Sequence, residues 1–127
     1  MNSAYSKVQV LIIGNDPMLS KATTALLRGV GYRVRSTNPL HAAEAARDGR
    51  YTAVILCATL SNEETEETVR AIRHSQPYIP IVSIHVGLLG DAPHPASSVV
   101  VDALRGRQAL ITAVNSVTPL RPQRHMG

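Results

Sequence analysis

The feature that most constrains the fold is a regular alternation of short apolar runs with segments that begin like helices. Four runs rich in aliphatic residues lie at positions 8–13, 52–56, 81–84 and 98–101, and a short strand is expected at 33–36. Helix starts stand between them: Asp16-Pro17 and Asn38-Pro39 pair a capping side chain with proline, and Ser61 to Glu64 forms a capping box. Strands that alternate with helices predict βαβ units and a parallel sheet.

The composition agrees with a sheet that is covered on both faces. The chain has 127 residues, enough for one domain, and 44% of them are hydrophobic although Phe and Trp are absent. The core must therefore consist mainly of Val, Ile, Leu and Ala, which suits strands buried on both sides. We expect helices over residues 17–30, 40–47, 61–75 and 106–117. The first should bury one face, formed by Leu19, Ala22, Leu26 and Val30.

The ordered domain is predicted to cover residues 7–117, after a flexible leader at 1–6 and before a flexible tail or linker at 118–127. Between the last two strands, residues 85–97 contain two glycines and two prolines, which predicts a shortened or missing fourth helix. The single cysteine, Cys57, excludes an internal disulfide, and without a signal-peptide pattern we expect a cytoplasmic protein. No apolar stretch is long enough to cross a bilayer, so no membrane contact is expected.

Three segments carry a family resemblance. "VLIIGNDP", "GYRVRSTNPLHAAEAARDGRYTAVIL" and "RAIRHSQPYIPIVSI" resemble the receiver domain of two-component response regulators. The resemblance covers roughly residues 7–117. It implies an α/β, flavodoxin-like, doubly wound five-stranded parallel sheet in the order 2-1-3-4-5.

The resemblance also places the positions where that family carries its chemistry. In that family, two acids after the first strand and an aspartate after the third together hold magnesium, and this aspartate accepts the phosphoryl group. A hydroxyl residue after the fourth strand and a lysine after the fifth assist. In this chain those five positions are occupied by Gly14, Asn15, Cys57, His85 and Asp102. The resemblance therefore implies a degenerate receiver, or pseudo-receiver, with no metal, no cofactor and no catalysis.

A non-phosphorylatable, receiver-like signal-transduction module would act by protein–protein interaction, with a partner from a signalling pathway. In the family, the fourth helix, fifth strand and last helix form the usual output and dimer surface. This chain alters that surface, which also offers a route to a homodimer. The interaction face that we predict on it consists of Leu88, Leu89, Val99, Val101, Arg105, Arg107 and Leu110.

Two alternatives place chemistry or a ligand at the carboxyl ends of the strands. Cys57 and His85 could pair as a redox or thiol sensor, although a small cysteine that fills the space of an aspartate explains Cys57 as well. A small ligand could bind in the crevice that such folds open at this edge. Histidines such as His85 and His94 fit no tight metal-binding spacing, so scattered histidines are the favoured interpretation.

A nucleic-acid partner is the least favoured alternative. The formal net charge is +4 and the sequence pI is about 9.7, which suits an anionic partner. However, the arginines are scattered along the chain, and aromatic residues make up only 3% of it, which leaves few side chains that could stack on bases. Only an arginine-bearing tail at residues 119–127 would offer such a contact.

Overall fold

The computed structural model describes residues 9–48, 50–86 and 94–120. The predicted leader and residues 121–127 of the predicted tail lie outside the described residues, as do Leu88 and Leu89. The elements follow in the order β1 (Gln9–Ile13), α1 (Pro17–Val30), β2 (Arg33–Thr37), η2 (Pro39–His41), α2 (Ala42–Asp48), β3 (Ala53–Leu56), α3 (Asn62–Ser75), β4 (Ile81–His85), β5 (Val99–Asp102), η4 (Ala103–Arg105) and α4 (Arg107–Val117).

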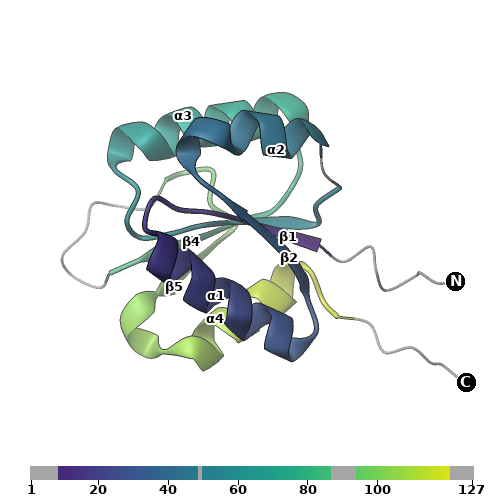
Figure 1. Ribbon diagram of the computed structural model, residues 1–127, viewed down its shortest axis with the longest axis vertical. Coiled ribbons are helices and arrows are strands. Elements are labelled where there is room, and N and C mark those ends of the chain that lie inside the picture. The colour runs from purple at the N-terminus through teal and green to yellow at the C-terminus, as the bar shows by residue number, and fades with distance from the viewer. Residues whose placement is uncertain (1–8, 49, 87–93, 121–127) are drawn as a thin grey trace, which may run out of the picture.

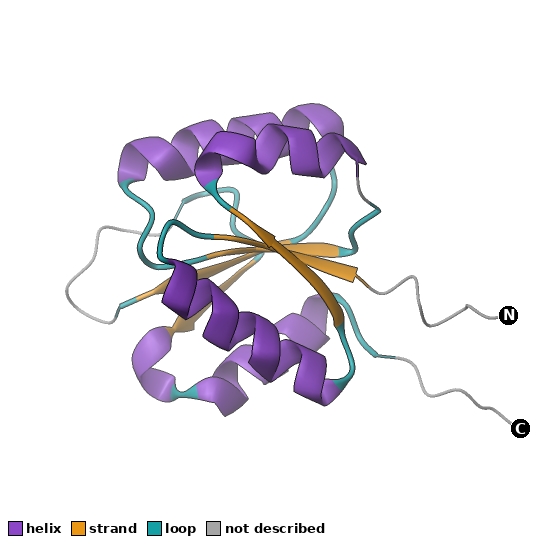
Figure 2. Cartoon of the chain, viewed as in Figure 1, coloured by secondary structure: helices purple, strands orange, loops and turns teal. Residues whose placement is uncertain are grey.

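The five strands form one parallel sheet in the order β2-β1-β3-β4-β5, which confirms the predicted topology. Helices α2 and α3 cover one face, and α1 and α4 cover the other (Figures 1 and 2). Because all strands are parallel, their carboxyl ends meet at one edge of the sheet. β2 and β5 are the two outer strands, and β1 and β3 lie next to each other in the middle.

Side-chain alternation along the strands builds two apolar layers. On β1, Val10 and Ile12 belong to the cluster that packs beneath α1 and α4, while Leu11 and Ile13 belong to the cluster beneath α2 and α3. All four side chains are fully buried. The core thus consists of two layers of mainly aliphatic side chains, one on each face of the sheet.

The predicted helix starts are confirmed. The carboxylate of Asp16 accepts hydrogen bonds from the backbone N–H groups of Met18 and Leu19, and Pro17 occupies the first turn of α1. Ser61 and Glu64 form the reciprocal capping box of α3. Because these contacts are local in sequence, they could be predicted from residue types alone.

The predicted buried face of α1 is only partly right: Leu26 packs against the apolar cluster beneath α1 and α4, but the other three residues are exposed. Leu19 is 47% exposed and Val30 is 39% exposed, whereas Ser20 and Leu27 are the buried residues of this helix. Seven residues separate Ser20 from Leu27, so they share one helical face. The physical reason is the narrow space at the end of β1, which admits a small side chain such as that of Ser20.

The connection from β4 to β5 is described at residue 86 and at residues 94–98, and these contain no helix. The rest of the expected short helix lies outside the described residues. His94 anchors the segment before β5: its Nε2 lies 3.0 Å from Oε1 of Glu66, and its Nδ1 accepts the N–H of Ala96. Within the described part of the chain, no helix has both the length and the apolar character needed to span a membrane.

Candidate functional site

Gly14 and Cys57 lie side by side at the carboxyl ends of the two central strands. β1 and β3 are in register up to the pair Ile13 and Leu56, and the N–H of Cys57 donates to the carbonyl of Ile13 at 3.0 Å. On the other side, the N–H of Gly14 donates to the carbonyl of Thr37 at 3.1 Å. The backbone at this point is therefore held firmly between β2 and β3.

The space beside Gly14 is filled. A Cβ atom at this position would lie 2.9 Å from Oγ of Ser20, 3.0 Å from Sγ of Cys57 and 3.1 Å from Cβ of Cys57. Such distances are shorter than ordinary van der Waals contact, so any side chain at position 14 would have to displace its neighbours. Ser20 is 8% exposed and belongs to this site, although nothing local in the sequence marks it.

The thiol of Cys57 is buried and held in its protonated form. Burial raises its pKa from an ordinary value of 9.0 to about 11, the hydrogen bond with Ser20 lowers it, and the charge of Asp16 raises it. The sulfur is part of the apolar cluster beneath α1 and α4. Because the thiolate is the nucleophile and the metal ligand, this environment disfavours both activities.

The polar groups around this point are engaged at helix starts. The side-chain amide of Asn15 donates to Oε1 of Glu64 at 2.8 Å, and the same carboxylate oxygen accepts the N–H of Ser61 at 2.9 Å. Asp16 caps α1. The two nearby carboxylates are therefore used to stabilise helices, one on each face of the sheet.

His85 and Asp102 form a second group, separate from the first. They pair in register at the ends of β4 and β5, on the outer half of the sheet. The register of β3 and β4 matches Leu56 with Ser83, which places Cys57 level with Ile84 instead of His85. The thiol's hydrogen-bond partner is Ser20, so the structure does not bring Cys57 and His85 together as a bonded pair.

The contacts of His85 and Asp102 indicate structural roles in this group. Nδ1 of His85 is buried and has no hydrogen-bond partner among the described residues. The carboxylate of Asp102 accepts the N–H of Leu104 at 2.9 Å and so caps η4. Asp102 therefore has a local structural role at the position where the resemblance places a lysine.

Comparison with known proteins gives a fold but no sequence family. No family model matches the chain, and no curated protein matches it. Solved receiver structures do match. The receiver domain of a sensor histidine kinase from Pseudomonas aeruginosa PAO1 aligns with a TM-score of 0.74 and 21% identity, covering 87% of this chain and 97% of that one.

Two further structures agree. The chemotaxis protein CheY4 of Vibrio cholerae aligns with a TM-score of 0.72 and 16% identity, over 87% of this chain and 98% of that one. A response regulator receiver protein of Sinorhizobium medicae WSM419 aligns with a TM-score of 0.71 and 21% identity, over 87% and 94% of the two chains. This chain has the receiver fold.

The P. aeruginosa receiver domain holds a magnesium ion in its active-site cleft. Magnesium requires hard oxygen ligands, usually carboxylates. Here Gly14 has no side chain, and Cys57 presents a protonated sulfur. Among the described residues, no group of three or more His, Cys, Asp or Glu side chains could hold a metal ion. The residues at this receiver position therefore do not fit magnesium.

The predicted interaction face is only partly a surface. Val101 and Leu110 are 5% and 7% exposed, so including them was wrong: both pack in the apolar cluster beneath α1 and α4. Val99 is half-buried, while Arg105 and Arg107 are exposed. The prediction missed Leu104, which is 76% exposed on η4.

A groove of about 580 Å³ runs between β5 and α4 on this face. Its lining includes the polar side chains of His85, Asp102, Arg105 and Gln108. Val100, which is 43% exposed, also lines it. The outer edge of the sheet thus carries exposed apolar and basic side chains around one shallow depression.

Proposed function

We propose that this receiver-like domain does not accept a phosphoryl group and acts in signal transduction by binding another protein. The observation that carries the proposal is the packing at the end of β1 and β3. Gly14, Ser20 and Cys57 fill the space in which a receiver would need its acids, and the thiol is protonated. A protonated, buried sulfur without an adjacent cation is a poor phosphoryl acceptor.

The proposed binding surface is the edge formed by β5, η4 and α4. Leu104 and Val100 expose apolar side chains there, and Arg105 and Arg107 add positive charge. β5 is an outer strand of the sheet, so among the described strands it has a neighbour on one side only. Apolar anchors surrounded by arginines are typical of protein–protein interfaces.

The first experiment tests the absence of phosphorylation. The purified domain is incubated with radiolabelled acetyl phosphate and magnesium, with the P. aeruginosa receiver domain as a positive control. We expect label on the control and none on this chain. Label that is stable on this chain but absent from its Cys57→Ala variant would overturn the proposal.

The second experiment tests the surface. A photo-crosslinking amino acid is placed at position 104 and, as a control, at position 78, where Tyr78 is 94% exposed on another part of the molecule. We expect crosslinks to one defined protein, or to a second copy of this chain, from position 104 only. Equal crosslinking from both positions, or none from position 104, would refute the assignment of this face.

A further inference from the structure

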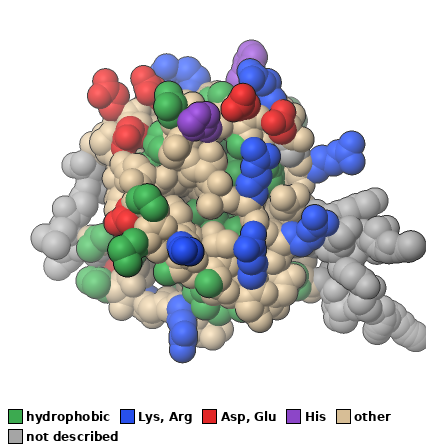
Figure 3. Space-filling model, in the orientation of Figure 1, with side chains coloured by type: hydrophobic (Ala, Val, Ile, Leu, Met, Phe, Trp, Pro, Cys, Tyr) green, Lys and Arg blue, Asp and Glu red, His purple; other side chains and the backbone are tan. Residues whose placement is uncertain are grey.

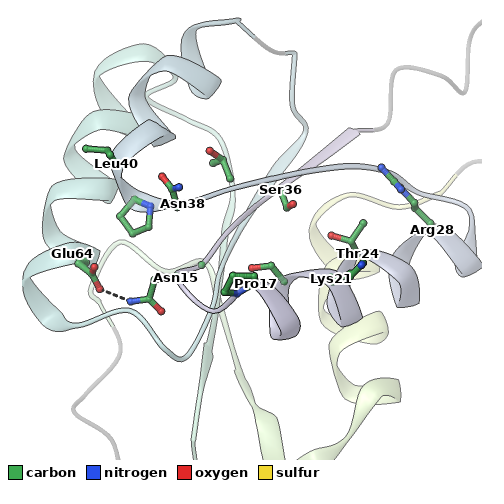
Figure 4. Close-up of a pocket in the computed structure, with 13 residues that line it drawn as sticks. Asn15, Pro17, Lys21, Thr24, Arg28, Ser36, Asn38, Leu40 and Glu64 are labelled. Atoms are coloured by element: carbon green, nitrogen blue, oxygen red, sulfur yellow. Dashed lines mark hydrogen bonds between the residues drawn. The ribbon is translucent and has the colours of Figure 1, made fainter.

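A second and larger cavity lies near β2, at the opposite edge of the sheet from the proposed partner surface on β5, η4 and α4. Its volume is about 700 Å³, and it runs between α1 and the carboxyl end of β2 (Figure 4). Small-molecule sites in proteins have volumes of roughly 300–1,000 Å³. The cavity lies beside the filled space at Gly14 and does not coincide with it, since its walls come mainly from α1 and from residues 36–40.

One wall carries positive charge and a hydroxyl in a row. Lys21, Thr24 and Arg28 follow one another at spacings of three and four along α1, so they share a helical face. By the helix rise, they span about 10 Å along the axis. Figure 4 shows these three side chains toward one end of the cavity.

The three side chains in this row have unused hydrogen-bonding capacity. Lys21 makes no ion pair or hydrogen bond with the described residues. Oγ1 of Thr24 is buried and has no partner there. Nη2 of Arg28 donates to the carbonyl of Val34 at 3.0 Å, which fixes the guanidinium while its other N–H groups stay available. A buried hydroxyl without a partner is costly unless something else supplies the bond.

The other end of the cavity has a different character. Pro17, Pro39 and Leu40 provide apolar surface, and Leu40 is 84% exposed. The side chains of Asn15 and Asn38 line the same end and offer amide groups (Figure 4). Among the described residues of the lining, Glu64 is the one carboxylate, and it already accepts two hydrogen bonds.

We infer that this cavity binds an organic phosphate monoester of about nucleotide size. Its phosphate would lie against Lys21, Thr24 and Arg28, because ammonium, hydroxyl and guanidinium groups are the usual partners of phosphate oxygens. Its uncharged body would lie against the prolines and Leu40, with the asparagine amides as hydrogen-bond partners. On the face shown in Figure 3, Lys and Arg side chains cross the middle of the molecule and most acidic ones lie near the top, which favours an anion.

The test is isothermal titration of the full chain with AMP, ribose 5-phosphate, adenosine and inorganic phosphate. We expect saturable binding of AMP or ribose 5-phosphate, and at least tenfold weaker binding of adenosine and inorganic phosphate, because each lacks one half of the ligand. No saturation by either phosphate ester at 10 mM would overturn the inference. This outcome is independent of the partner surface, which lies on another edge.

Two variants locate the site. Lys21→Gln should weaken binding at least about tenfold, whereas Arg70→Gln removes the same charge from an exposed pair on α3 and should leave binding unchanged. Thr24→Val should weaken binding several-fold and yet raise the melting temperature of the ligand-free protein, because its hydroxyl has no partner there. Equal losses in Lys21→Gln and Arg70→Gln would show unspecific charge attraction and refute the site.

Discussion

The substitution Gly14→Ala tests the claim that the receiver pocket is filled. The added methyl group would lie within 3.1 Å of two atoms of Cys57 and of Oγ of Ser20. Overpacking of this kind costs about 1–3 kcal/mol of unfolding free energy. The conformation of Gly14 itself adds no cost, since among the described glycines only Gly31 and Gly106 have a positive φ.

A double-mutant cycle identifies the cause. Cys57→Ala removes the sulfur that stands 3.0 Å from the new methyl group and should by itself cost about 1 kcal/mol, as for the loss of one buried heavy atom. In the combined variant the methyl group occupies part of the vacated space. The combined cost should therefore be lower than the sum of the single costs by about 1 kcal/mol or more.

The assay is urea unfolding of the four proteins at pH 7, with equal m-values as the condition for comparison. Gly29→Ala is the matched control: a Cβ atom there meets nothing within 4 Å, and the residue lies inside α1. This control should gain about 0.5–1 kcal/mol from the higher helix propensity of alanine. If Gly14→Ala also gains stability, or if the cycle is additive within about 0.5 kcal/mol, the pocket is not filled as described.

Three further predictions concern single side chains. Because the pKa of Cys57 is raised to about 11 in the folded protein, its contribution to stability is fully present below about pH 9 and is lost as the pH rises toward 11. Urea unfolding at several pH values should therefore show that the wild type loses up to about 2.7 kcal/mol more unfolding free energy over this range than Cys57→Ala does. Identical pH profiles of the two proteins would contradict this. Thr68→Val should raise the free energy of unfolding by about 1 kcal/mol, because the buried hydroxyl of Thr68 has no partner among the described residues. Thr52→Val should lower it, because the hydroxyl of Thr52 is hydrogen-bonded to Gln9 and Thr118. If both variants changed the free energy of unfolding in the same direction, the reasoning would be refuted. Tyr32→Phe should cost about 1 kcal/mol by thermal or urea unfolding, since its buried hydroxyl lies 3.0 Å from the carbonyl of Thr118; an unchanged stability would show that this bond contributes nothing.

The strands and the helix starts could be predicted because their signals are local, whereas the strand order came from the family resemblance. An apolar run between two capped helices is visible within a window of about ten residues, and the caps at Asp16 and Ser61 depend on neighbours three positions away. Gly14 comes directly after β1 and Cys57 directly after β3, so locating the two strands was enough to align both residues with the acidic positions of the receiver family.

The rest of the site depends on contacts that the sequence does not reveal. Ser20 belongs to the site because α1 is rotated so that a small side chain faces Gly14, and hydrophobicity alone favoured Leu19 instead. Likewise, Val101 and Leu110 are as apolar as surface anchors would be, and only packing shows that they face inward. The cavity along α1 has no motif at all, because its residues come from three separate segments.

The packing at Gly14 also predicts that the single substitution Cys57→Asp should not create a receiver-type phosphorylation site. Cys57→Asp would place a carboxylate in the apolar cluster beneath α1 and α4, beside Ser20 and under the charge of Asp16. Without a cation beside it, burial would raise the pKa of that carboxyl and lower the stability of the domain. Magnesium would also lack a ligand at position 14, because a Cβ atom there would lie 2.9 Å from Oγ of Ser20, which leaves no room for an acidic side chain. For a receiver-type acid site to fit here, positions 14, 20 and 57 would therefore have to change together, because their side chains share one packed space.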